Sequence, residues 1–86
     1  MLSMEEIWNR IVLHEGNEFT QKRGKVFIYK MNGNVIVPNT TNISISKGEV
    51  EKAWNRMPVN GPGEINDLMA PSYLYAILND QRIANP

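Results

Sequence analysis

The sequence predicts an α+β domain in which a helix is followed by a small antiparallel β-hairpin or three-stranded meander, and then by two further helices. Three observations predict this order: a capped amphipathic segment at the start, an Asn-Gly pair between two β-branched runs, and two later segments with helical apolar spacing. The chain has 86 residues, of which 42% are apolar and 21% charged, so we expect a single globular domain spanning residues 1–86.

The first helix is expected at residues 3–15. Ser3 and Glu6 have the Ser-x-x-Glu spacing of a capping box, in which each side chain accepts a hydrogen bond from the other residue's main-chain amide. Gly16 suits the left-handed conformation that often ends a helix. The apolar residues between them recur at the spacing of one buried stripe: Met4, Ile7, Trp8, Ile11 and Val12.

A hairpin is predicted at Asn32-Gly33, because a type I′ turn needs positive φ at both central residues and Asn-Gly adopts it readily. With these two residues as the loop, Tyr29 lies opposite Ile36. A short strand at residues 18–21 completes a meander. The register predicts one face with Phe27, Tyr29, Met31 and Ile36, and a second face with Val26, Ile28, Lys30, Val35 and Val37.

The second half of the chain predicts helices separated by loops. Residues 39–44 are polar and are interpreted as a connector. A second helix is expected at 47–57, and Ser46 with Glu49 predicts a second capping box at its start.

The segment after this helix holds two prolines and two glycines at residues 58–64, so we expect a loop without regular structure. A third helix is predicted from Pro71, which suits a first helical turn, to about Asp80. The last residues are expected to be loose apart from Ile83.

The composition excludes several kinds of site. The chain has no cysteine and one histidine, which removes disulfides, thiolate zinc sites and most other metal sites. Its apolar runs are far shorter than the roughly 20 residues of a membrane span, and no signal peptide is expected. We therefore expect a cytoplasmic, non-enzymatic protein that needs no cofactor or metal and does not contact a membrane.

The formal charge is zero, but the charges are unevenly distributed. The stretch between Phe19 and Gly48 contains no acidic residue, so it carries +5 and the remainder −5. Its five cations are Lys22, Arg23, Lys25, Lys30 and Lys47. This pattern predicts nucleic-acid binding through phosphate contacts, with polar support from Asn39, Thr40, Thr41 and Asn42. The alternative is that the cations only keep strand edges from pairing with other chains.

A protein-interaction or homodimerisation module is the second predicted function. Both predicted sheet faces are mainly apolar, so the second face must be covered by the chain's own helices or by another molecule. Two tyrosines flank Leu74 in the third helix, and they cannot both face inward. The candidate interface residues are Val35, Val37, Tyr73 and Tyr75.

Two further readings are less favoured. Phe27 and Tyr29 alternate on one strand as base-stacking residues do, but an ordinary core face has the same alternation, and we interpret them as core. His14 has no second base, nucleophile or metal ligand at useful spacing, so we interpret it as a helix cap rather than as part of a hydrolase.

The end of the chain has the pattern Pro-Ser-Tyr-x-x-Ala-Ile-Leu-x-Asp-x-Arg-Ile at residues 71–83, preceded by the run from Pro62 to Asn66. This segment resembles one found in small, uncharacterised bacterial and phage proteins. Residues 16–19, 24–29 and 45–53 are similar as well. No activity is attached to this family, and the resemblance implies an accessory role near DNA-handling systems.

Overall fold

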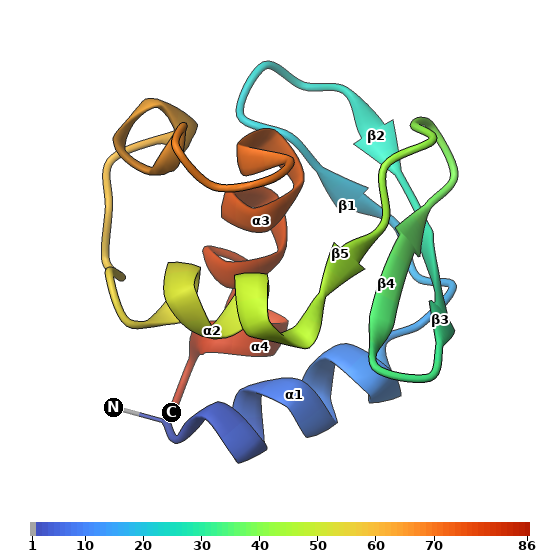
Figure 1. The fold of residues 1–86 in the computed structure, drawn as a ribbon, viewed down its shortest axis with the longest axis horizontal. Coiled ribbons are helices and arrows are strands. Elements are labelled where there is room, and N and C mark those ends of the chain that lie inside the picture. Colours follow the sequence, from blue (N-terminus) through green and yellow to red (C-terminus); the bar gives the residue numbers. More distant parts are fainter. Residues whose placement is uncertain (1) are drawn as a thin grey trace.

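The computed structural model describes residues 2–86, which form helices packed against two small antiparallel sheets (Figure 1). In chain order the elements are α1 (Met4–Leu13), β1 (Phe19–Thr20), β2 (Val26–Phe27), β3 (Tyr29–Asn32), β4 (Val35–Pro38), β5 (Ile45–Ser46), α2 (Lys47–Trp54), the 3-10 helix η1 (Pro62–Ile65), α3 (Pro71–Leu78) and α4 (Gln81–Ala84). In Figure 1, the helices α2, α3 and α4 lie beside one another, α1 runs beneath them, and the strands lie together to the right of α3. The predicted α+β class is confirmed.

The capping box at the start of α1 is present. The Ser3 hydroxyl accepts a hydrogen bond from the Glu6 amide at 3.1 Å, and the Glu6 carboxylate accepts one from the Ser3 amide at 3.2 Å. Of the predicted stripe, Ile7, Trp8 and Ile11 are buried, but Val12 is 45% exposed. Val12 lies about 100° around the helix from the buried Ile11, on the exposed side of α1, so the expectation for Val12 was wrong.

The strands follow the predicted antiparallel order, but they form two sheets rather than one three-stranded meander. The strand expected before the hairpin is interrupted at Ile28, so β2 pairs with β1 in one sheet and β3 pairs with β4 in the other. The additional strand β5 places Ile45 opposite Ile36, so β4 is the central strand of its sheet. Sequence analysis had assigned no strand there because the preceding residues are polar and β5 has only two residues.

The hairpin loop is one residue further along the chain than predicted. Asn32 pairs with Val35, so the loop residues are Gly33 and Asn34. Gly33 has a φ of 60°, whereas Asn32 and Asn34 are not among the residues with positive φ. A type II′ turn needs positive φ at its first central position alone, and glycine there avoids the strain that Asn32 would bear in a type I′ turn. Tyr29 consequently lies opposite Pro38, but the shift leaves every side chain on its predicted face.

The second capping box is only half formed. The Ser46 hydroxyl accepts a hydrogen bond from the Glu49 amide at 3.2 Å, but the Glu49 carboxylate accepts from the Met69 amide at 3.1 Å and pairs with Lys52 at 3.2 Å. The Met69 and Lys52 contacts lower the pKa of Glu49. Helix α2 ends at Trp54, three residues before the predicted end.

The C-terminal part is more regular than expected. η1 lies partly inside the segment predicted to lack regular structure, and α4 occupies the tail expected to be loose. Asp80 begins α4, since its carboxylate accepts a hydrogen bond from the Arg82 amide at 2.9 Å. Ile83 is fully buried, as predicted.

The core lies between the inner sheet faces and the helices, with an aromatic cluster at its centre. The ring centres of Phe19 and Tyr29 are 5.3 Å apart, and Phe27 packs edge-on against Tyr73 with 4.8 Å between the ring centres. Phe27 and Tyr29 are buried, so they are core residues rather than an open stacking platform.

Candidate protein-interaction surface

The strands present a second, partly exposed face, which we call the outer sheet face. Because side chains alternate along a strand, residues between the buried Phe27, Tyr29 and Ile36 point to the other side. In Figure 1, α2, α3 and α4 lie to the left of β3 and β4, and α1 lies below them. We define the outer sheet face by Lys30, Asn32, Val35 and Val37, which share one side of the β3–β4 pair, together with Val26 and Ile28, which precede β3 in the same alternation.

The register gathers its aliphatic residues around one lysine. Lys30 lies opposite Val37, and Asn32 lies opposite Val35. Val26 is 48% exposed, and Ile28, Val35 and Val37 are half-buried. The result is an aliphatic patch on adjacent strands with a single positive charge within it.

The free edge of β3 is closed by the chain itself. The Glu15 carboxylate accepts a hydrogen bond from the Met31 amide at 2.6 Å, and the Gly16 amide donates to the Tyr29 carbonyl at 3.0 Å. These contacts occupy main-chain groups that a partner strand would otherwise pair with. A partner of this sheet is therefore directed to the outer face rather than to the β3 edge.

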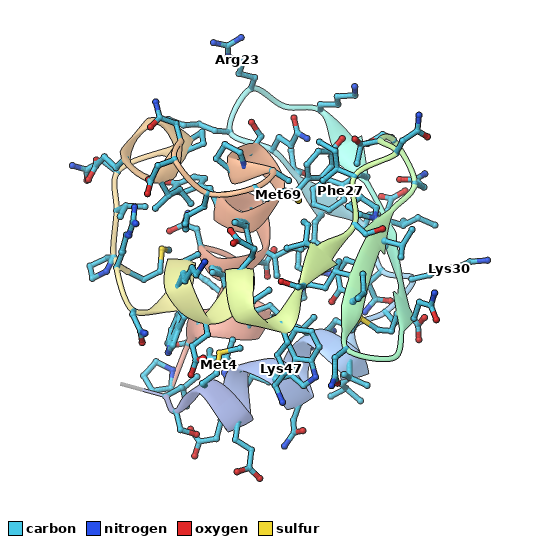
Figure 2. The ribbon with its side chains drawn as sticks, in the orientation of Figure 1. Met4, Arg23, Phe27, Lys30, Lys47 and Met69 are labelled. Atoms are coloured by element: carbon cyan, nitrogen blue, oxygen red, sulfur yellow. The ribbon has the colours of Figure 1, made fainter. Side chains whose placement is uncertain are left out.

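The structure separates the five cations that sequence analysis grouped. Figure 2 shows Arg23 at the β1–β2 turn, Lys30 on β3 and Lys47 at the start of α2, pointing in three different directions. Lys22 donates to the Asn60 carbonyl at 2.8 Å, and the Lys47 nitrogen lies 5.4 Å from the centre of the Trp8 ring. They do not form one compact patch.

The remaining three cations are unengaged. Arg23, Lys25 and Lys30 are exposed and make no hydrogen bond or ion pair within the described part of the chain. Of the five predicted cations, these three have exposed side chains that are available to a partner.

Most of the expected polar support is used internally. The Asn39 side-chain oxygen accepts a hydrogen bond from the Ile28 amide at 3.0 Å, and the Asn39 main-chain amide donates one to the Ile28 carbonyl at 2.9 Å. Thr40 shares a 2.7 Å hydrogen bond with the Tyr73 hydroxyl, and Thr41 accepts one from the Ile43 amide. Asn42 is exposed. The side chains of Asn39, Thr40 and Thr41 therefore hold the β4–β5 connection in place.

The two candidate tyrosines have different environments. Tyr73 is buried against Phe27, so it is not available to a partner, and its proposed place in an interface was wrong. Tyr75 is half-buried, and its hydroxyl lies 3.4 Å from the Asn60 carbonyl. As expected, only one of the two tyrosines is left near the surface.

His14 has the surroundings of a capping residue. It follows α1, and its Nδ1 atom lies 3.0 Å from the Asn17 side-chain amide. Among residues 2–86, no group of three histidine, aspartate or glutamate side chains is arranged to hold a metal ion. In the same residues, no helix is long and apolar enough to cross a membrane.

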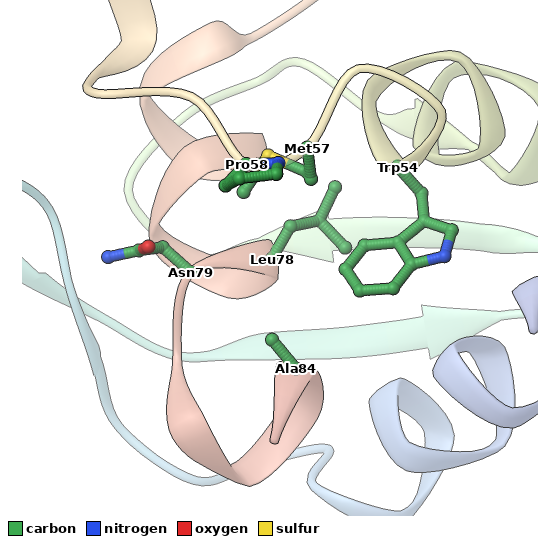
Figure 3. Close-up of a pocket in the computed structure, with 6 residues that line it drawn as sticks. All are labelled: Trp54, Met57, Pro58, Leu78, Asn79 and Ala84. Atoms are coloured by element: carbon green, nitrogen blue, oxygen red, sulfur yellow. The ribbon is translucent and has the colours of Figure 1, made fainter. Parts of the chain in front are cut away.

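An apolar groove of about 350 Å³ lies where α2, α3 and α4 end or begin, and sequence analysis did not identify it. Figure 3 shows Leu78 between the Trp54 ring and Pro58, with the Asn79 side chain pointing away from Trp54. Met57 and Ala84 complete its lining. These residues come from three separate segments, so no local sequence pattern marks the groove.

No family model matches the chain, and neither the curated proteins nor the solved structures contain a match. The resemblance of residues 16–83 to bacterial and phage accessory proteins therefore stays a prediction.

Proposed function

We propose that the protein is a non-enzymatic interaction module that binds another protein surface through its outer sheet face. The observation that carries the proposal is the aliphatic patch of Ile28, Val35 and Val37, which is only half-buried, whereas Tyr29 and Ile36 on the other face of the same strands are fully buried. Burying apolar surface is the main favourable term in protein association, at roughly 25 cal/mol per Å² before the costs of binding.

The charges around the patch define the partner's chemistry. Lys30 lies within the patch, Lys25 is near its Val26 end in the sequence, and no acidic residue occurs between Phe19 and Gly48. Protein interfaces combine apolar contacts with polar and charged groups. Complementary potentials favour a partner that offers apolar and acidic side chains together.

The test compares baits that differ at one residue of the patch. Wild-type protein and Val35→Glu are used to capture partners from an extract of the native cells, and a candidate partner is then purified and titrated. We expect the substitution to weaken binding at least tenfold, because it places a charge among the aliphatic contacts and repels the partner's acidic side chains. Met69→Glu is the matched control, since Met69 is 51% exposed and lies outside the outer sheet face.

The proposal fails if two results coincide: no purified partner depends on Val35, and the chain does not associate with itself through this face. Thermal unfolding of both variants establishes that each is folded.

Nucleic-acid binding is a second candidate because Arg23, Lys25 and Lys30 are unengaged cations in a segment without acids. Such binding would depend on phosphate contacts, since Phe27 and Tyr29 are buried and offer no base-stacking surface.

Fluorescence anisotropy with short duplex and single-stranded oligonucleotides tests this candidate. With three phosphate contacts, the slope of log K against log salt concentration is expected to be about −2.7. Replacing Arg23, Lys25 and Lys30 by alanine removes the binding, whereas Lys52→Ala, outside the segment, leaves most of it. Absence of binding at low ionic strength overturns the candidate.

A further inference from the structure

We propose that the outer sheet face binds a second copy of the chain, which lays the exposed side of its α1 across the patch. This inference rests on the proposed function and names the partner of the same surface. It predicts a contact between two different surfaces, α1 of one copy and the outer sheet face of the next.

The exposed side of α1 has apolar residues that its own core does not use. Leu13 is 76% exposed and Val12 is 45% exposed, the former being the most exposed large apolar side chain in the described residues. Glu5, Glu6 and Asn9 are exposed on the same helix. At 100° per residue, these five positions fall within one arc of the helix, opposite the buried Ile7, Trp8 and Ile11.

The two surfaces have complementary charges. The exposed arc of α1 carries the carboxylates of Glu5 and Glu6, whereas Lys30 is the charged residue of the outer sheet face. Two sheet faces packed against each other about a twofold axis would combine two positive surfaces. A helix bearing carboxylates avoids that repulsion and supplies Val12 and Leu13 to the aliphatic patch.

The arrangement also completes the layers of the fold. A sheet with apolar residues on both faces is normally covered on both, and a helix is a common covering element. The chain's own helices cover the inner face, so α1 of a neighbour supplies the missing layer. Because the contact joins different surfaces, each added copy leaves one of each free, and assembly proceeds to rings or open chains.

Sedimentation velocity of the full chain tests this proposal, at low ionic strength and from about 10 μM to 1 mM, the range in which weak association is measurable. We expect the weight-average mass of the wild type to rise with concentration and to fall when salt is added. Leu13→Glu removes the α1 surface, and Val35→Glu removes the sheet surface because it places a carboxylate where Glu5 and Glu6 of the neighbour approach, so each variant alone remains monomeric.

An equimolar mixture of Leu13→Glu and Val35→Glu provides the decisive observation. Each variant retains the surface that the other has lost, so the mixture forms a species of twice the monomer mass and nothing larger. Met69→Glu, which changes an exposed methionine outside both surfaces, behaves as the wild type. Thermal unfolding establishes that every variant is folded.

Three outcomes overturn the inference: a wild type that is monomeric throughout, a mixture that stays monomeric, and assembly that requires Val35 but not Leu13. In the first case, a different partner that depends on Val35 still supports the proposed function. The third result keeps the outer sheet face as an interaction surface and excludes α1 as its occupant.

Discussion

Tyr29 donates a hydrogen bond from its buried hydroxyl to the main-chain carbonyl of Ile11, with 2.5 Å between the two oxygens. This contact joins the first residue of β3 to the last turn of α1. Tyr29→Phe removes the donor and leaves the Ile11 carbonyl without it, so we expect a loss of about 1–2 kcal/mol in the free energy of unfolding. Urea denaturation measures the effect, and an unchanged midpoint would contradict it.

The same tyrosine predicts a dependence of stability on alkaline pH. Burial raises the pKa of Tyr29 well above its ordinary value of 10.0, so the folded chain retains the phenolic proton at pH values where the unfolded chain releases it. Stability then falls as the pH rises above 10. The stability difference between wild type and Tyr29→Phe should shrink over this range. Urea titrations from pH 8 to 11 measure the difference, and a constant value would contradict this assignment.

Arg82, at the start of α4, makes a set of contacts that we expect a lysine not to reproduce. Its guanidinium contacts both Asp80 carboxylate oxygens at 2.9 and 3.0 Å, donates to the Glu18 carbonyl at 2.7 Å and lies 4.1 Å from the centre of the Phe19 ring. Lysine keeps the charge but not the planar geometry that makes these contacts together.

We expect Arg82→Lys to lower the free energy of unfolding by about 1 kcal/mol, because the contacts are partly exposed. Arg56→Lys is the comparison, since the Arg56–Asp67 pair is bidentate but lies on the surface away from aromatic rings. Equal effects in chemical denaturation would show that the Glu18 and Phe19 contacts add nothing.

Gly33 predicts which residues form the hairpin loop. It alone of the loop residues has positive φ, at 60°, so Gly33→Ala should cost about 1 kcal/mol or more through backbone strain. Asn34→Ala is the matched substitution and should cost less. Thermal unfolding of the two variants checks the order, and the reverse order would contradict a turn with glycine at its first central position.

This hairpin illustrates how much of the fold the sequence predicts. The alternation of apolar residues assigned Tyr29 and Ile36 to the same face. That assignment survives because the partner of Tyr29 moved by two positions, from Ile36 to Pro38, and a shift of two residues keeps every side chain on its face. The error arose because Asn32-Gly33 and Gly33-Asn34 are both favourable hairpin pairs, and only the backbone conformation distinguishes them.

Other features depended on contacts between distant residues. The capping box of Glu6 is local and was predicted correctly, whereas the Glu49 carboxylate binds an amide 20 residues away. Likewise, the sequence predicted two apolar sheet faces but not that the face of Tyr29 is fully buried while the other is only half-buried. The separation of Arg23, Lys30 and Lys47 is also a consequence of tertiary structure, which composition cannot reveal.

Gly61 and Lys22 form the last testable pair. A Cβ atom built on Gly61 would lie 2.7 Å from the Lys22 nitrogen, which donates to the Asn60 carbonyl. The φ of Gly61 is 178°, an extended conformation that any residue adopts, so alanine is opposed only by the lysine side chain. Because the end of a lysine moves easily, we expect Gly61→Ala to cost less than about 1 kcal/mol.

A double-mutant cycle isolates this contact. In a Lys22→Ala background, the Gly61→Ala substitution should cost almost nothing, because the atom that opposed the new methyl group is gone. The coupling free energy from urea denaturation of the four proteins is therefore expected to be nonzero and to account for most of the single-variant effect. If Gly61→Ala is equally destabilising in both backgrounds, its cost comes from the backbone of the η1 segment, and Lys22 does not determine the need for glycine at this position.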